Sequence, residues 1–145
     1  SRISHGIANG FGGGIAIWEA DPVIANCMIN ENYGVQNGGG IEVFNGASPT
    51  ISDCQFISNR TDWSGAGICV EQHSDPRIER CDFMMNIAGG GGGGFALYFA
   101  SSPVVSHCNF TENRAGMGAG AYLRNEGSRP QFEWCDFYRN TAAGG

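Results

Sequence analysis

The grouping with the most chemical potential consists of charged residues that recur at one position of a repeat. Asp53, Arg80 and His107 each come four residues after a proline, and Glu79 and Asp82 flank Arg80. If the repeats stack, carboxylates surround a basic side chain, a grouping suited to proton transfer. Opposite charges stacked on an exposed turn would also form an ion-pair ladder. We favour the ladder and predict no catalytic residues, because catalysis also needs a walled cleft that short repeats do not supply.

Cysteines also recur at a fixed interval. Five of the six lie 27 residues apart: Cys27, Cys54, Cys81, Cys108 and Cys135. Stacked in register about 4.8 Å apart, their Cβ atoms stay too distant for disulfides, which need about 3.8 Å. We predict a ladder of small buried thiols. No C-x-x-C spacing is present, so we predict no metal ligands and no cofactor. Cys69 lies between Ile68 and Val70 on an alternating strand, and its thiol is expected to face outward and to be accessible.

Asparagines keep the same 27-residue interval, at Asn32, Asn59, Asn86, Asn113 and Asn140. Asparagine tolerates the left-handed turn conformation, and its amide can bond the equivalent amides on both sides of it in a stack. We interpret this column as a structural ladder and not as a ligand site.

The elements that must position these residues follow from the repeat itself. All five prolines share the 27-residue step, at positions 22, 49, 76, 103 and 130, and glycine tracts precede alternating runs such as 41–43 and 68–70. Alternation with β-branched and aromatic members predicts a half-buried strand. A second short strand follows each proline, and a third carries the cysteine and a phenylalanine two residues later. A variable glycine-rich loop after each asparagine leads to the next unit.

Units this small cannot bury their own hydrophobic rows, so they must stack. The sequence predicts an all-β fold, a right-handed three-faced parallel β-helix of about five 27-residue coils. We assign residues 1–145 to a single β-helix segment, part of a longer solenoid, because no atypical capping unit is visible at either end.

The tetrapeptides carry a family resemblance. GGGI at 38–41 and GAGI at 65–68, followed by FISN at 56–59 and FMMN at 83–86, resemble the paired motifs of polymorphic outer membrane proteins. The SPTISDCQF stretch at 48–56 is similar to right-handed β-helix repeats generally. The resemblance implies a pectin-lyase-like coil and a surface-exposed passenger or adhesin-like role, in an extracellular or cell-surface setting.

Composition limits the partners. The chain has eight arginines, no lysine, fourteen carboxylates and a net charge of −6, which argues against nucleic acid. No apolar run approaches the roughly 20 residues that span a bilayer. We expect a glycan or another surface protein as partner, and end-to-end or other self-association is open.

One strand face is the candidate binding surface. The residue after each inward pair is expected to point outward: Trp18, Phe44, Glu71, Tyr98 and Arg124. Three aromatic rings on a solvent face can form a platform for a sugar or a partner, with Arg124 as polar anchor. The rings could equally pack on one another as a stiffening ladder, or lie under neighbouring loops.

An enzyme remains the alternative function. The resemblance implies a fold that also hosts polysaccharide lyases and hydrolases, and the lyases use an arginine or lysine base beside carboxylate-bound calcium. Asp82 and Asp136, two repeats apart in one column, match the roughly 5–10 Å carboxylate spacing of glycosidases, as would many other pairs. The two hypotheses are therefore an extracellular structural or adhesive segment and a scaffold portion of a carbohydrate-active enzyme.

Overall fold

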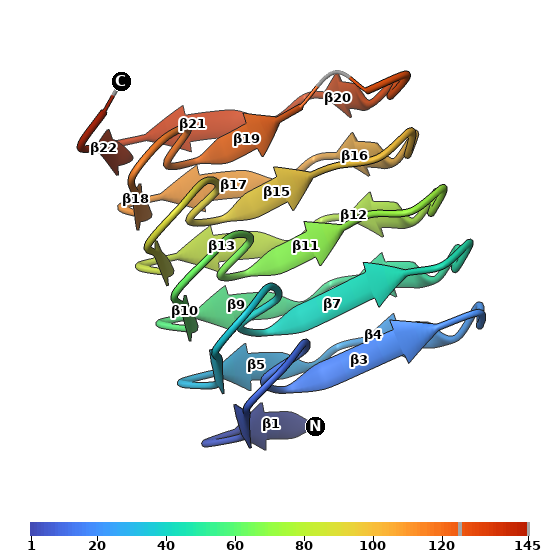
Figure 1. Ribbon diagram of the computed structural model, residues 1–145, viewed down its shortest axis with the longest axis horizontal. Coiled ribbons are helices and arrows are strands. Elements are labelled where there is room, and N and C mark those ends of the chain that lie inside the picture. The colour runs from blue at the N-terminus through green and yellow to red at the C-terminus, as the bar shows by residue number, and fades with distance from the viewer. Residues whose placement is uncertain (125, 145) are drawn as a thin grey trace.

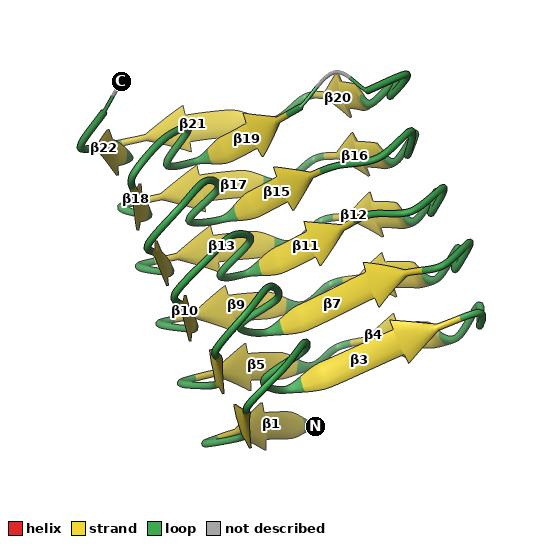
Figure 2. Ribbon diagram, viewed as in Figure 1, coloured by secondary structure: helices red, strands yellow, loops and turns green. Residues whose placement is uncertain are grey.

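Short parallel strands stack into a β-helix in the computed structural model, which describes residues 1–124 and 126–144 (Figure 1). Each strand pairs with the equivalent strand one coil away, so that Ile41 lies beside Ile68 and Ile68 beside Phe95. Figure 2 shows strands and loops throughout the described residues, and no helix there is long and apolar enough to cross a bilayer. The predicted solenoid of about five 27-residue coils is confirmed.

Four narrow sheets run along the stack. Sheet A contains β1 (Arg2–Ser4), β5 (Met28–Asn30), β9 (Gln55–Ile57), β13 (Asp82–Met84), β17 (Asn109–Thr111) and β21 (Asp136–Tyr138). Sheet B contains β2 (Ile7–Ala8), β6 (Tyr33–Gly34), β10 (Arg60–Thr61), β14 (Ile87–Ala88), β18 (Arg114–Ala115) and β22 (Thr141–Ala142). Sheet C contains β3 (Ile15–Trp18), β7 (Ile41–Phe44), β11 (Ile68–Val70), β15 (Phe95–Leu97) and β19 (Ala121–Leu123). Sheet D contains β4 (Val23–Ala25), β8 (Thr50–Ser52), β12 (Arg77–Glu79), β16 (Val104–Ser106) and β20 (Gln131–Glu133).

Sheets A, C and D are the three predicted faces, and sheet B is an addition. Its strands are only two residues long and fall where the sequence predicted a loop. A strand of two residues is too short to show alternation of apolar and polar side chains, so the sequence pattern cannot reveal it. Small side chains between sheet B and the glycine tracts, including Ala66, Ala88 and Ala115, form a second apolar cluster separate from the main core.

The main core consists of ladders of identical or similar side chains. The rings of Phe56, Phe83, Phe110 and Phe137 stack in sequence with centroids 4.6 to 4.7 Å apart. Column cysteines line the same core, and the Cys81 thiol donates to the carbonyl of Glu79 at 3.2 Å, as does Cys108 to Ser106. All six cysteines are free. Cys54, Cys81 and Cys108 are buried, whereas Cys27 and Cys135 near the two ends are half-buried.

The asparagine column forms a continuous hydrogen-bonded ladder. The Asn86 amide nitrogen donates to Asn113 Oδ1 at 3.0 Å and to the carbonyl of Phe56 at 2.9 Å. Its Oδ1 accepts from the backbone and side-chain nitrogens of Asn59. The left-handed conformation, however, belongs to the preceding residue, for example Met85 with φ 55°. The asparagines themselves serve the ladder and not the turn, because their side chains point inward to bond neighbouring coils.

Candidate functional site

The outer face of sheet C carries two columns of side chains. Glycine-rich loops cover most of the first column. The second, called the open column, contains Trp18, Phe44, Glu71, Tyr98 and Arg124. The covered column contains Ala16, Glu42, Cys69, Ala96 and Tyr122, which are register partners across the five strands. Its three middle members are buried, whereas Tyr122 is half-buried and Ala16 is exposed. Glycine tracts pass directly over its middle members. A Cβ atom added to Gly38 would lie 2.6 Å from Glu42 Oε2, and one added to Gly65 would lie 2.5 Å from Cys69 Cβ. Only glycine permits this close approach, and both glycines have φ near +66°.

The expectation that Cys69 is accessible is wrong. Its side chain does point away from the main core, as alternation predicts, but the glycine loop encloses it completely. Burial raises the pKa of the Cys69 thiol, and the neighbouring Glu42 and Glu71 carboxyls raise it further. Alternation identifies the side of a strand, and it says nothing about a loop that folds back over that side.

The open column is the predicted binding surface, and the structure divides it in two. Trp18 stacks against Phe44 at 6.0 Å between ring centroids, with Phe11 5.7 Å from Phe44. Tyr98 lies two coils beyond Phe44, and together with Arg124 it lines a pocket separate from the Trp18 and Phe44 rings. Buried Glu71 interrupts the column between the two groups.

A pocket of about 260 Å³ lies above Glu71. Its lining residues come from sheet C, from the turns that follow it and from the glycine-rich loops: Asn37, Trp63, Ser64, Glu71, Tyr98, Phe99 and Arg124. The Tyr98 hydroxyl donates to Ser64 Oγ at 2.7 Å, and the Ser64 amide donates to Asn37 Oδ1 at 3.2 Å. These bonds tie the loops to the strand, so the pocket wall is held in place.

Four lining residues were missed by sequence reasoning: Asn37, Trp63, Ser64 and Phe99. They occupy the variable loops and turns, which have no repeating column. The one available signal was Trp63, a large aromatic residue in a loop of otherwise small and polar residues. Its side chain stays 59% exposed in the folded chain.

Electrostatics in and below the pocket are dominated by acids. Burial raises the pKa of Glu71, and burial together with the Glu71 charge raises that of Glu42 well above its ordinary value. Burial also raises the pKa of Tyr98 to about 12, so its phenol stays protonated. The nearest ligand atoms of Glu42, Cys69 and Glu71 lie within 4.8 Å of one another. The sequence predicted no metal ligands because it has no C-x-x-C spacing, and these three residues come together only through the stacking of coils.

The acid–base grouping on the turns around sheet D is an ion-pair ladder in part: Asp53, Arg80 and Glu79 are paired, whereas His107 and Asp82 are in no ion pair within the described ranges. Arg80 donates to Asp53 through Nε at 2.8 Å and through Nη2 at 2.9 Å, and its Nη1 lies 3.0 Å from Glu79 Oε2. Asp53 raises the pKa of Arg80, and Arg80 lowers the pKa of Asp53. A guanidinium held in its charged form is a poor proton acceptor.

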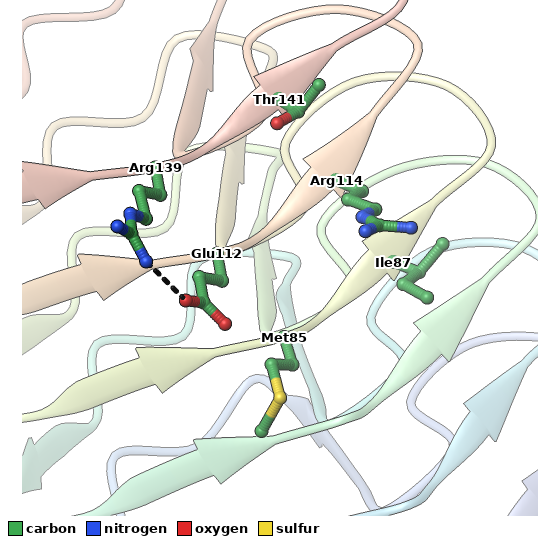
Figure 3. Close-up of a pocket in the computed structure, with 6 residues that line it drawn as sticks. All are labelled: Met85, Ile87, Glu112, Arg114, Arg139 and Thr141. Carbon is green, nitrogen blue, oxygen red and sulfur yellow. Dashed lines mark ion pairs between the residues drawn. The ribbon is translucent and has the colours of Figure 1, made fainter.

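A larger depression of about 490 Å³ lies beside sheets A and B (Figure 3). Its lining residues are Met85, Ile87, Glu112, Arg114, Arg139 and Thr141, and all six are exposed. Glu112 and Arg139 form an ion pair at 3.9 Å across it. The depression contains no buried polar group to orient a ligand, so the pocket on sheet C is the better candidate.

Comparison with known families agrees with this architecture. A family model described as a right-handed β-helix region matches residues 2–144. The chain belongs to this family. The match covers every strand, and the family is right-handed, which agrees with the predicted handedness of the coils. No curated protein and no solved structure matches the chain.

Proposed function

We propose that this right-handed β-helix is an extracellular or cell-surface segment that binds a glycan on the outer face of sheet C without catalysing a reaction. The observation that carries the proposal is the exposure of aromatic side chains beside a polar pocket. Trp18 is 62% exposed, and Trp63 and Phe99 are also largely open to solvent. The main core is complete without them.

Sugars fit this combination of groups. A sugar ring offers a C–H face to an aromatic ring and hydroxyls to hydrogen-bonding side chains at its edge. Trp63 and Phe99 provide the aromatic surface, while Arg124 and Glu71 provide charged partners within one pocket. An apolar partner would cover the Glu71 carboxyl and the Arg124 guanidinium without offering either a hydrogen bond, and that loss disfavours it.

The dimensions of the surface suit an extended ligand. Three coil steps of about 4.8 Å separate Trp18 from Tyr98, which places the two aromatic groups roughly 14 Å apart along one face. Phe44 lies between them, half-buried against Trp18. A chain of several sugar units could contact both groups at once, and such multiple contacts raise affinity without a deep cleft.

The setting rests on the tetrapeptide motifs. Their resemblance to polymorphic outer membrane proteins supports a surface-exposed, adhesin-like role and an extracellular location. Buried thiols are compatible with that location, because four of the six are enclosed and shielded from oxidants. Another surface protein, or a second copy of the chain docking end to end, is a further partner that the same surface-display role would accommodate.

One observation favours the enzymatic alternative, in which the chain is scaffold for a carbohydrate-active enzyme. Glu71 is a carboxyl with a raised pKa at the floor of a pocket, a property shared by general acids. Its nearest carboxyl partner, Glu42, is fully enclosed and cannot touch a substrate. Binding without chemistry is therefore the better-supported function.

The test compares exposed tryptophans on two faces. A Trp18→Ala, Trp63→Ala, Phe99→Ala triple variant should lose binding on an array of immobilised glycans. Trp134→Ala is the matched control, because Trp134 is 80% exposed on the distant turn after sheet D. Tryptophan fluorescence titrated with the glycan selected on the array should respond in the control and not in the triple variant. Unchanged binding by a folded triple variant would overturn the proposal, and release of shorter sugars by wild type but not by Glu71→Gln would favour the enzyme.

A further inference from the structure

Two adjacent residues in the covered column of sheet C carry groups that can bind a metal ion. Glu42 on β7 and Cys69 on β11 are direct register partners on adjacent coils. Their neighbours in the column are Ala16 on one side and Ala96 on the other. Glu71 follows Cys69 by two residues and so lies on the same face. These residues are thus confined to one place in the stack.

The Glu42 carboxyl is unusual because the polar side chains within its reach are those of Glu71 and Cys69, one of them a second acid. Both of its oxygens are buried and have no hydrogen-bond partner among the described residues, and the side chain has no solvent exposure. Buried polar groups in native proteins are nearly always paired, so each exception calls for an explanation. Glu42 Oε2 lies under the backbone of Gly38, and its ligand atom faces those of Cys69 and Glu71.

We propose that Glu42, Cys69 and Glu71 bind one divalent transition-metal ion of the Zn²⁺ class between coils two and three. The three ligand atoms lie within 4.8 Å of one another. Zn²⁺ binds thiolate at about 2.3 Å and carboxylate at about 2.0–2.2 Å, so small side-chain rotations bring all three atoms onto one ion. The thiolate favours Zn²⁺ over Ca²⁺ or Mg²⁺, which prefer oxygen ligands.

Access and charge are consistent with this assignment. Glu71 also lines the pocket beside Trp63 and Arg124, so the cluster borders the pocket through this carboxyl. Three protein ligands would leave the fourth position of a tetrahedral ion to water. Burial raises the pKa of all three groups in the absence of a cation, and neighbouring carboxylate charge raises those of Glu42 and Cys69 further. A bound divalent ion reverses this effect and holds the ligands in their deprotonated forms. The metal site shares Glu71 with the glycan pocket but does not require glycan binding, and the two are measured separately.

Cobalt titration tests the site directly. The full chain, reduced and stripped with a chelator, is titrated with Co²⁺ and followed by the thiolate-to-cobalt charge-transfer absorption. We expect saturation at one equivalent, and loss of the absorption when excess Zn²⁺ displaces Co²⁺. Cys69→Ser should abolish the charge-transfer band. Because loss of a supporting contact alone weakens metal binding about 10–100-fold, Glu42→Gln should weaken Zn²⁺ binding by at least about 100-fold.

Cys135→Ser is the control, because Cys135 is a free thiol far along the stack and its loss should leave the titration unchanged. Circular dichroism establishes that each variant is folded. Folded wild-type protein that takes up no stoichiometric Co²⁺ would overturn the proposal and identify the cluster as a proton-sharing acid pair. A charge-transfer band that survives in Cys69→Ser but disappears in Cys135→Ser would also overturn it.

Discussion

Truncation of Phe83 tests whether ladder packing holds the coils together. The ring has no solvent exposure and stacks between Phe56 at 4.7 Å and Phe110 at 4.6 Å, nearly parallel to both. Buried phenylalanine-to-alanine changes destabilise proteins by about 3–5 kcal/mol. Two ring–ring contacts, each contributing about 0.5–1.5 kcal/mol beyond area burial, place Phe83→Ala toward the upper end of that range.

Phe137 provides a matched comparison in the same ladder. It is the last ring of the stack, has one parallel neighbour at 4.7 Å and is 50% exposed. Phe137→Ala should therefore cost about half as much, on the order of 2 kcal/mol. Both variants remove the same atoms from the same position of the repeat, so the difference between them isolates enclosure between coils.

The measurement is equilibrium unfolding in urea, followed by far-ultraviolet circular dichroism and by tryptophan fluorescence. Solenoids can lose coils independently, so coincidence of the two probes must be checked before a single free energy is extracted. The slope of the transition should be unchanged if only stability is altered. Equal losses in the two variants, or a loss below about 1 kcal/mol in Phe83→Ala, would refute the ladder argument.

Three further predictions concern buried polar groups. The pKa of Glu42 is raised in the folded state, so the contribution of this group to stability is fully present below pH 4.5 and is lost as pH rises from 4.5 through the folded pKa. In metal-free protein at pH 8, Glu42→Gln should therefore be more stable relative to wild type than at pH 4, by about 1.4 kcal/mol for each pH unit, up to pH 8, by which the folded pKa of Glu42 exceeds 4.5. The same difference in unfolding free energy between the two proteins at pH 4 and at pH 8 would contradict this. Thiol labelling of native protein should modify Cys27 and Cys135 first and leave Cys69 until unfolding, as mapped by peptide mass; early labelling of Cys69 would show that its loop opens. Asn86→Ala leaves the buried hydrogen-bond partners of Asn86 unpaired, at a cost of about 1–3 kcal/mol each. The free energy of unfolding from chemical denaturation should therefore fall by at least about 3 kcal/mol, and a fall of less than about 1 kcal/mol would show that the ladder does not stabilise the fold.

Most of the fold is predictable from the sequence because each coil repeats the same physical solution. The 27-residue columns specify which side chains meet, and stacking in register follows from parallel strand pairing. Two features could not be read this way. Sheet B has strands too short to alternate, and the left-handed turn residues, such as Glu31, Ser58 and Met85, share a position but no residue type. Residue type therefore gives no signal for the left-handed conformation at this position.

The candidate site is only partly predictable for a related reason. Trp18 and Tyr98 were predicted because alternation places their side chains on the outer side of the β-helix, and both lie on the outer face of sheet C in the structure. Glu71 was assigned to that face as an interruption, whereas it forms the pocket floor. The alternation of residues in a strand does not predict the course of the variable loops. These loops enclose Cys69 and bring Trp63 and Asn37 over the strand. That course depends on the second alanine cluster and on glycines with positive φ.

The regularity of the coils explains how an unsatisfied group such as Glu42 can persist. In a solenoid, stability is approximately a sum of coil and interface contributions, so neighbouring ladders offset a local loss. Ile41 and Val43 flank Glu42 in sequence and both pack fully in the core, and Asn32 and Asn59 continue their ladder through the same two coils. The coils are therefore held in place from the inside, and the outer face is free to vary. Departures from the repeat on that face, in Glu42, Cys69 and Glu71, are where selection for function can act without loss of the fold.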